Sequence, residues 1–265
     1  MAKSFYGQAD AGYIPDKDGY QKAREAAERA LQSDPNLGEA HAALGWITMH
    51  YDWNWAFSEA SYQRALELDS ENVAAIGAAG VLSATLGRLD ESIERFRKAI
   101  KIDPLNPVAY RNMGYYLYYA GRLQEAIAAL KKALELTPAL AIAHGILGEV
   151  YLAQGQPKAA LAEMQKEKDP DLRLQGLALA YQALGRKQES DANLAELVGK
   201  FADGPYYISE VYAFLGKKDR AFEWLDKAYA ARDSGLTEIK GDPLLKNLEH
   251  DPRYAVLLKK LGLPL

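Results

Sequence analysis

The sequence predicts an all-α protein, a right-handed superhelical solenoid of about seven helix-turn-helix repeats with a C-terminal capping helix. Glycines recur with a period of 34 residues in two registers. The first register contains Gly80, Gly114 and Gly148, and the second contains Gly87, Gly121 and Gly155. A small residue, a bulky one and another small one follow Gly87 and Gly121 at fixed spacing, and a proline comes after them. A 34-residue period with small residues in register indicates stacked helical hairpins.

Each repeat has the composition of two antiparallel helices. The first helix carries an apolar residue followed by glycine, as in Leu147-Gly148. A glycine such as Gly155 then ends that helix in the left-handed conformation, at little conformational cost. The second helix places small residues where neighbouring helices must approach closely and a bulky residue such as Leu130 where a gap must be filled. We therefore expect consecutive hairpins to stack.

The repeat register divides the chain into an array over residues 1–232 and a C-terminal cap over residues 233–265. The repeats are expected at 3–35, 36–70, 71–104, 105–138, 139–169, 170–201 and 202–232. An array needs an end piece over its last exposed core face, and the final segment is the natural candidate. We expect Asp242-Pro243 and Asp251-Pro252 each to start a short helix there.

Three departures from the repeat pattern predict local irregularities. The first repeat is expected to have a helix near residues 4–13 and then a loop through Pro15 and Asp18-Gly19. The second has an extra residue in its turn, beside the aromatic stretch 51–55. The fifth has Glu167 where a small residue belongs and loses residues around Asp169-Pro170. We expect a distorted junction at this last position.

Composition excludes several classes of protein. The chain has 265 residues, a formal net charge of −4 and no cysteine. It therefore has no disulfide framework, thiolate metal site or cysteine nucleophile. The slightly acidic balance argues against a broad nucleic-acid surface. No apolar run approaches 18 residues and the first residues do not resemble a signal peptide, so we expect no membrane insertion. Cytoplasm is the default location, and an extracytoplasmic one stays open.

The motif residues resemble those of tetratricopeptide-repeat proteins over nearly the whole chain. Two stretches are similar to the repeat region at the C-terminus of bacterial signalling proteins. They are the insert 51–56 and the ending 251–263, with sequences Tyr-Asp-Trp-Asn-Trp-Ala and Asp-Pro-Arg-Tyr-Ala-Val-Leu-Leu-Lys-Lys-Leu-Gly-Leu. In that group the repeats follow a winged-helix, nucleotide cyclase or protein kinase domain, none of which is present here. The resemblance implies a regulatory role in signal transduction, as the sensory part of a longer chain.

In such an array the first helix of each repeat lines a concave groove, which predicts a surface for a protein or peptide. The candidate partner-binding residues are Trp46, Met49, His50, Arg111, Tyr115, Tyr118, Tyr119, Glu149, Tyr206, Glu210 and Phe214. Aromatic side chains separated by glycine and alanine suit an extended peptide or an amphipathic helix. The alternative for the tyrosines of residues 115–119 is ordinary packing between helices. Trp53 and Trp55 are expected to be structural, filling the widened turn.

Other kinds of site are not supported by the sequence. A carboxylate clamp is not indicated, because its groove positions hold Ala42, Trp46, Gly77 and Val81, although Arg111 can still pair with one acidic group. His41 and His144 are expected in the core, and no spaced histidine pair predicts a metal site. No phosphate loop, nucleophile elbow or zinc helix is present, so we expect no enzyme and no cofactor. The second function that stays open is self-association, for example as a homodimer, through an apolar end face.

Overall fold

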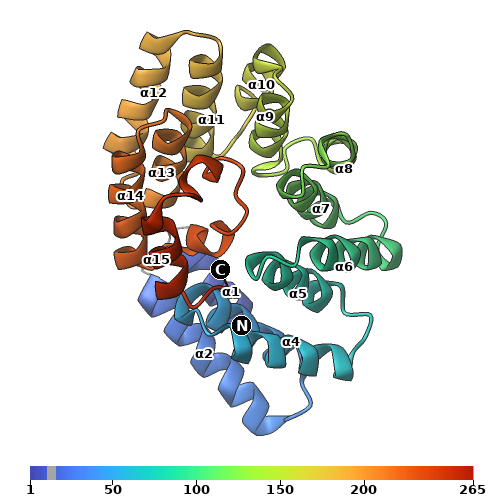
Figure 1. The fold of residues 1–265 in the computed structure, drawn as a ribbon. Coiled ribbons are helices and arrows are strands. Elements are labelled where there is room, and N and C mark those ends of the chain that lie inside the picture. Colours follow the sequence, from blue (N-terminus) through green and yellow to red (C-terminus); the bar gives the residue numbers. More distant parts are fainter. Residues whose placement is uncertain (11–15, 265) are drawn as a thin grey trace. The chain divides into compact units, whose positions relative to one another are not determined.

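The computed structural model describes residues 1–10 and 16–264, which form α-helices, short helical turns and loops (Figure 1). The chain separates into two compact units, Met1–Pro104 and Leu105–Leu265. The helices of the first unit are α1 (Ala2–Asp10), α2 (Asp16–Ser33), α3 (Gly38–Ile47), α4 (Trp55–Leu68), α5 (Val73–Thr85) and α6 (Leu89–Ile102). A π-helical turn, η1 (Thr48–Asp52), lies between α3 and α4. No strand occurs in the described residues, so the predicted all-α class is confirmed.

The second unit contains four further helical pairs and a less regular end. Its paired helices are α7 (Pro107–Tyr119), α8 (Leu123–Leu136), α9 (Ala143–Ala153), α10 (Pro157–Met164), α11 (Pro170–Ala183), α12 (Lys187–Lys200), α13 (Pro205–Phe214) and α14 (Lys218–Ala231). They are followed by the 3-10 turns η2 (Ser234–Glu238) and η3 (Lys246–Leu248) and by helix α15 (Pro252–Lys260). Each helix packs most extensively on its pair partner, and consecutive pairs in each unit contact one another. Within each unit this is the α-solenoid arrangement.

Glycine makes the tight turns inside the pairs possible. Between α7 and α8 the chain turns at Gly121, whose φ is +72°. Its N–H donates to Tyr118 O at 2.9 Å, and Arg122 N–H donates to Leu117 O at 2.8 Å. These bonds satisfy the last carbonyl groups of α7, which would otherwise have no partner. The glycines of this register therefore recur because each turn needs a left-handed residue.

The other glycine register lies where a helix touches its partner. A Cβ atom on Gly114 of α7 would stand 2.6 Å from Leu130 Cγ and 3.2 Å from Ala126 O of α8. Leu130 is fully buried, so it cannot move into solvent. Gly148 of α9 has the same relation to Met164 of α10, where the Cβ-to-Cγ distance would be 2.6 Å. The predicted complementarity of small and bulky residues is confirmed at these positions.

Replacing Gly114 with alanine is therefore expected to destabilise the second unit by about 2 kcal/mol. Overpacking a buried contact typically costs about 1–3 kcal/mol. The higher helix propensity of alanine offsets only about 1 kcal/mol of that cost. Gly199→Ala is the matched control, because nothing lies within 4 Å of the Cβ it would add. Urea unfolding followed by circular dichroism measures both, and equal stability of the two variants would contradict the close-approach explanation.

The predicted irregularities have mixed outcomes. The expected loop at Asp18-Gly19 is wrong, since α2 already begins at Asp16, while Pro15 lies outside the described residues. Asp242-Pro243 starts a turn and no α-helix, so this prediction is wrong, and the Asp242 side chain accepts from the N–H of Leu244 at 2.8 Å. Asp251 does cap α15, accepting from Arg253 N–H at 3.0 Å. Helix α15 lies against α14, where the Arg253 guanidinium stands 4.1 Å from the Phe222 ring centre.

The distorted junction predicted in the fifth repeat is present and has a specific cause. Glu167 follows the short helix α10 and is only 2% exposed. Its carboxylate accepts hydrogen bonds from four backbone N–H groups: Ile142 at 3.2 Å, Gly145 at 2.9 Å, Lys168 at 2.7 Å and Asp169 at 3.0 Å. A buried carboxylate thus joins the start of α9 to the loop before α11.

Candidate functional site

The first helices of the four pairs in the second unit, α7, α9, α11 and α13, carry most of the predicted binding residues. Those on α7 are Arg111, Tyr115, Tyr118 and Tyr119, the one on α9 is Glu149, and those on α13 are Tyr206, Glu210 and Phe214. We call the surface formed by these four helices the inner surface. The structure therefore brings eight predicted residues onto one set of elements, as the repeat register requires.

Part of the inner surface is occupied by the chain itself. Residues 234–250, which we call the return segment, follow α14 and contact α13 through η2 and η3. The Tyr115 hydroxyl donates to the Glu238 carboxyl group, although these residues are 123 positions apart. The Tyr206 hydroxyl donates to Asp242 at 2.7 Å, and the Asn247 side chain donates to Ala213 O at 2.6 Å. The return segment thus reaches from α13 to α7.

Several predicted residues are consequently not exposed. Tyr118 is 3% exposed, Tyr206 1%, Glu210 4% and Glu149 9%. The expectation that Tyr118 lies open in a groove is wrong. The side chain is buried, and its ring packs edge-on against that of Tyr119, with ring centroids 6.0 Å apart. Tyr115 and Tyr119 are half-buried, and their hydroxyl oxygens lie 2.8 Å apart. Burial alone does not decide which of these residues bind a partner.

Arg111, predicted to pair with an acidic ligand, makes its short contacts inside the protein. Its guanidinium donates to Asn112 Oδ1 from Nε at 3.0 Å and from Nη2 at 2.9 Å. A weaker contact of 3.4 Å joins it to Ala141 O. Burial lowers the pKa of Arg111, and the charge of Glu238 opposes that shift. The guanidinium therefore contributes positive charge to the inner surface.

Four carboxyl groups gather at the contact between the return segment and the inner surface. They are Glu149, Glu210, Glu238 and Asp242. Burial raises the pKa of each one, and the neighbouring carboxyl groups raise the pKa values of Glu149 and Glu210 further. The pKa of Glu238 rises to about 7. Gln175 donates to Glu210 at 2.6 Å, which orients that carboxyl group.

The sequence analysis did not identify Glu238, Asp242 or Gly235 as part of this site. Gly235 lies against the Tyr206 ring, where an added Cβ would stand 2.7 Å from Tyr206 Cγ. These residues follow the last repeat, so no periodic position marks them. The Asp-Pro pair at 242–243 was the one sequence signal for this part of the site. It was interpreted as a helix start, whereas the Asp242 carboxyl group accepts a hydrogen bond from Tyr206.

The three predicted residues of the first unit lie in or beside the π-helical turn, with Met49 and His50 inside it and Trp46 near the end of α3. Met49 is fully buried and His50 is 8% exposed, so the expectation that they line an open groove is wrong. The His50 ring stacks on Trp46 with centroids 3.9 Å apart, and its Nδ1 lies 3.1 Å from Trp46 O. Burial lowers the pKa of His50 to about 4. The imidazole is therefore neutral at physiological pH and packs as an aromatic ring.

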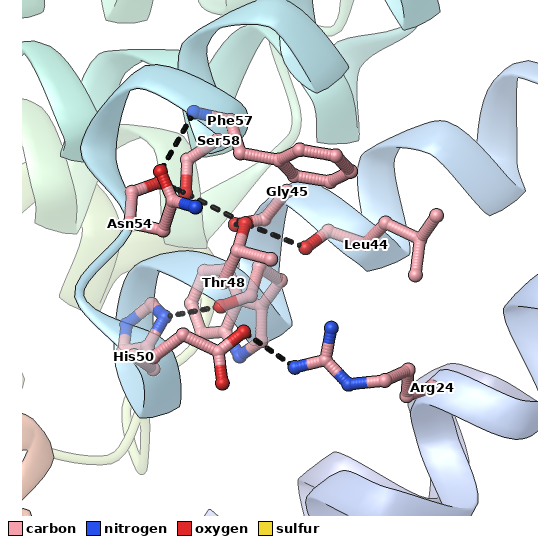
Figure 2. Close-up of polar contacts among 10 residues, drawn as sticks. Arg24, Leu44, Gly45, Thr48, His50, Asn54, Phe57 and Ser58 are labelled. Carbon is pink, nitrogen blue, oxygen red and sulfur yellow. Dashed lines mark hydrogen bonds and ion pairs between the residues drawn. The ribbon is translucent and has the colours of Figure 1, made fainter.

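The widened turn itself is a packed structural feature, as predicted for its tryptophans. Thr48 Oγ1 donates to Leu44 O at 2.9 Å and lies 2.8 Å from Ser58 Oγ of α4 (Figure 2). Trp53 adopts the left-handed conformation with φ 54°, and Asn54 then caps α4 by accepting from Phe57 N–H at 3.2 Å. The extra residue is thus accommodated by the π-helical turn.

Thr48→Val is expected to lower the free energy of unfolding of the first unit by about 1 kcal/mol, the net contribution of an ordinary hydrogen bond. Valine preserves the shape but removes the hydroxyl that contacts Ser58, whose own hydroxyl keeps Asn54 O as a partner at 3.0 Å. Thermal or urea unfolding measures the change. Exposed Ser33, whose hydroxyl donates to Arg29 O, provides the control Ser33→Ala. If Thr48→Val is as neutral as the control, the hydroxyl pair does not hold the turn.

Two further histidines, His41 and His144, have protein partners. Half-buried His144 places Nδ1 2.7 Å from Glu163, and His41 places Nε2 2.9 Å from Pro35 O. Within residues 1–10 and 16–264 no group of three or more histidine, aspartate or glutamate side chains is placed to hold a metal ion. In the same described part, no helix has the length and apolar character needed to cross a membrane.

Comparison with known families identifies the repeats. A family model described as "Tetratricopeptide repeat" matches residues 111–172, and one described as "TPR repeat" matches residues 84–119. Residues 84–172 therefore contain tetratricopeptide repeats. The two matches overlap within α7. No curated protein sequence matches the chain.

Solved tetratricopeptide-repeat structures resemble the fold. PilW, described as a widely conserved type IV pilus biogenesis factor, has a TM-score of 0.63 at 24% identity, covering 79% of this chain and 96% of its own. A thermophilic TPR protein of Thermus thermophilus has a TM-score of 0.59 at 20% identity, covering 67% and 98%. Pseudomonas aeruginosa PilF has a TM-score of 0.58 at 19% identity, covering 80% and 97%. At these identities the likeness supports the tetratricopeptide-repeat fold alone.

Proposed function

We propose that the chain is a non-catalytic interaction module that binds a segment of a partner protein on the inner surface of the second unit. Tetratricopeptide repeats generally mediate contacts between proteins, and the matched repeats include α7 and α9. Two of the predicted binding residues, Tyr115 of α7 and Tyr206 of α13, donate hydrogen bonds to the return segment. The proposed partner segment would take the place that the return segment now occupies.

The return segment supports this proposal, because it is a segment of the same chain that lies on the inner surface. Residues 234–250 contain short 3-10 turns and no α-helix. The segment is bound by tyrosine hydroxyl groups from two different helices, α7 and α13. Two aliphatic side chains, Leu236 and Ile239, are at most 1% exposed. Aromatic anchors with a few oriented polar groups are typical of peptide-binding surfaces.

The test uses a variant that weakens the binding of the return segment to the inner surface, together with a synthetic peptide that can take its place. Gly235→Ala in the full chain would bring a Cβ within 2.7 Å of the Tyr206 ring, which is 1% exposed and cannot yield. The probe is a fluorescein-labelled synthetic peptide of residues 233–250, and its binding is measured by fluorescence anisotropy. We expect at least about tenfold tighter binding to Gly235→Ala than to the unmodified chain, because a tethered segment competes at an effective concentration in the millimolar range.

Gly199→Ala is the matched control and should behave as the unmodified chain does. If Gly235→Ala loses helicity by circular dichroism, Gly241→Ala replaces it, since a φ of +82° strains any residue with a side chain. Equal affinity of the peptide for the variant and for the unmodified chain, or no binding to either, would contradict the proposal that the inner surface binds a partner segment.

Finer functional statements stay predictions. They are a regulatory role in a bacterial signalling protein, self-association as a homodimer, exclusion of nucleic acid and a cytoplasmic location. Light scattering over a concentration series tests the second of these, because a self-associating chain gains mass with concentration.

A further inference from the structure

The first half of the return segment is a short loop fixed at both ends. Helix α14 ends at Arg232 in the left-handed conformation with φ 57°. After the loop, Leu244 packs into a core that includes Leu174, Ile208 and Val211. Residues 234–242 lie between these points, and we call them the latch loop. Its inward side chains lie on the inner surface, where Thr237 is 3% exposed.

The latch loop brings two carboxyl groups onto a surface that already has two. Glu238 and Asp242 come from the loop, while Glu149 and Glu210 come from α9 and α13. Side chains of Glu210 and Asp242 are hydrogen-bonded to each other. Two carboxyl groups can share such a bond only if one of them carries a proton.

Other charged and titratable groups do not neutralise this cluster. The groups that interact with its members are Arg111, Tyr115, Tyr116, Tyr118 and Tyr119 of α7, Tyr206 and Tyr207 of α13, and Asp233 and Tyr254 of the C-terminal part. Lys240 of the loop instead donates to Pro264 O at 2.8 Å. Burial raises the pKa of each of Tyr115, Tyr118 and Tyr206 well above its ordinary value, so these hydroxyl groups remain donors. Arg111 is the cation that acts on Glu238.

We propose that the latch loop stays on the inner surface while its carboxyl cluster holds protons, and that it lifts away when they are lost. Lifting uncovers Tyr118, Glu149 and Glu210 and makes the inner surface available. The loop is thus an intramolecular, proton-dependent competitor of the partner. This inference rests on the proposed function, because the uncovered surface is the one proposed to receive the partner.

The direction of the pH dependence follows from the seated and lifted states. A lifted carboxyl group is in water and titrates near its ordinary value of 4.5, whereas the pKa of seated Glu238 is about 7. The seated state therefore binds more protons over this interval. Seating is strongest below pH 4.5 and weakens as the pH rises to about 7. Glu149 and Glu210 act in the same direction, since their pKa values are raised as well.

The absence of cysteine makes the test direct. Thr237→Cys places a single thiol in the latch loop, and Ala195→Cys places one at an exposed position of α12 as the control. The maleimide labelling rate of each full chain is measured from pH 5.5 to pH 8.5. The ratio of the two rates removes the ordinary titration of the thiol. Loss of the Glu238 proton alone predicts a rise of about thirtyfold in this ratio.

Two further variants assign the rise to the cluster. Glu238→Gln and Glu210→Gln, each combined with Thr237→Cys, preserve hydrogen bonding but remove one ionising group. Each should keep the thiol protected to higher pH and reduce the rise at least about threefold, with circular dichroism confirming retained helicity. A ratio that is constant across the pH range, or a rise unchanged in both variants, would overturn the proposal. Since labelling requires no partner, a pH-dependent ratio with no peptide binding would reject the proposed function alone.

Discussion

Replacing Glu167 with alanine is expected to lower the free energy of unfolding of the second unit by about 3–4 kcal/mol. The carboxylate accepts four backbone N–H bonds and is 2% exposed. A hydrogen bond to a charged group contributes about 1.5–3 kcal/mol, and buried donors left without a partner add a desolvation cost. Water can reach some of the freed N–H groups, so the sum is not fully lost.

Urea unfolding followed by circular dichroism measures this loss. Glu135→Ala is the control, because the Glu135 side chain is 68% exposed and its ion pair with Lys132 lies on the surface. Such pairs contribute at most about 1 kcal/mol. Glu167→Gln should fall between, since an amide oxygen accepts fewer of the four bonds well. If Glu167→Ala matches Glu135→Ala, the carboxylate does not hold α9 to the loop before α11.

Glu167 also shows where sequence reasoning succeeds and where it stops. Its position was interpreted as a misfit in the repeat, and the distorted junction predicted from it is present. The partners of the carboxylate were not predictable, because they are backbone N–H groups that every residue except proline has. By contrast, the spacing of small and bulky residues predicted that helices approach closely and that Leu130 fills a gap, and the structure places Leu130 against Gly114.

The sequence predicts which helices form the inner surface, but it does not predict that the return segment covers part of that surface. Repeat spacing placed Tyr115, Glu149 and Glu210 on the first helices of their pairs, and the structure places them there. Repeat spacing could not show that residues after the last repeat return to α7, because no repeat period links Tyr115 to Glu238. Burial of Tyr118 follows from this return and from local tyrosine packing. Repeat spacing therefore predicts which helices line a groove. Whether the groove is open to solvent depends on segments outside the repeats.

Leu244→Ala is expected to lower the free energy of unfolding of the second unit by about 3 kcal/mol. Leu244 is 7% exposed and packs with Leu174, Leu179 and Ile208. Truncating a buried leucine typically costs about 2–5 kcal/mol, because the transfer free energy is lost and a cavity remains. Val256→Ala is the control, since that side chain of α15 is 54% exposed. Urea unfolding compares the two, and a loss below about 1 kcal/mol for Leu244→Ala would mean that the return segment is not anchored in the repeat core. The latch loop would then lack its fixed end, and any lifting would have to include the whole of residues 234–250.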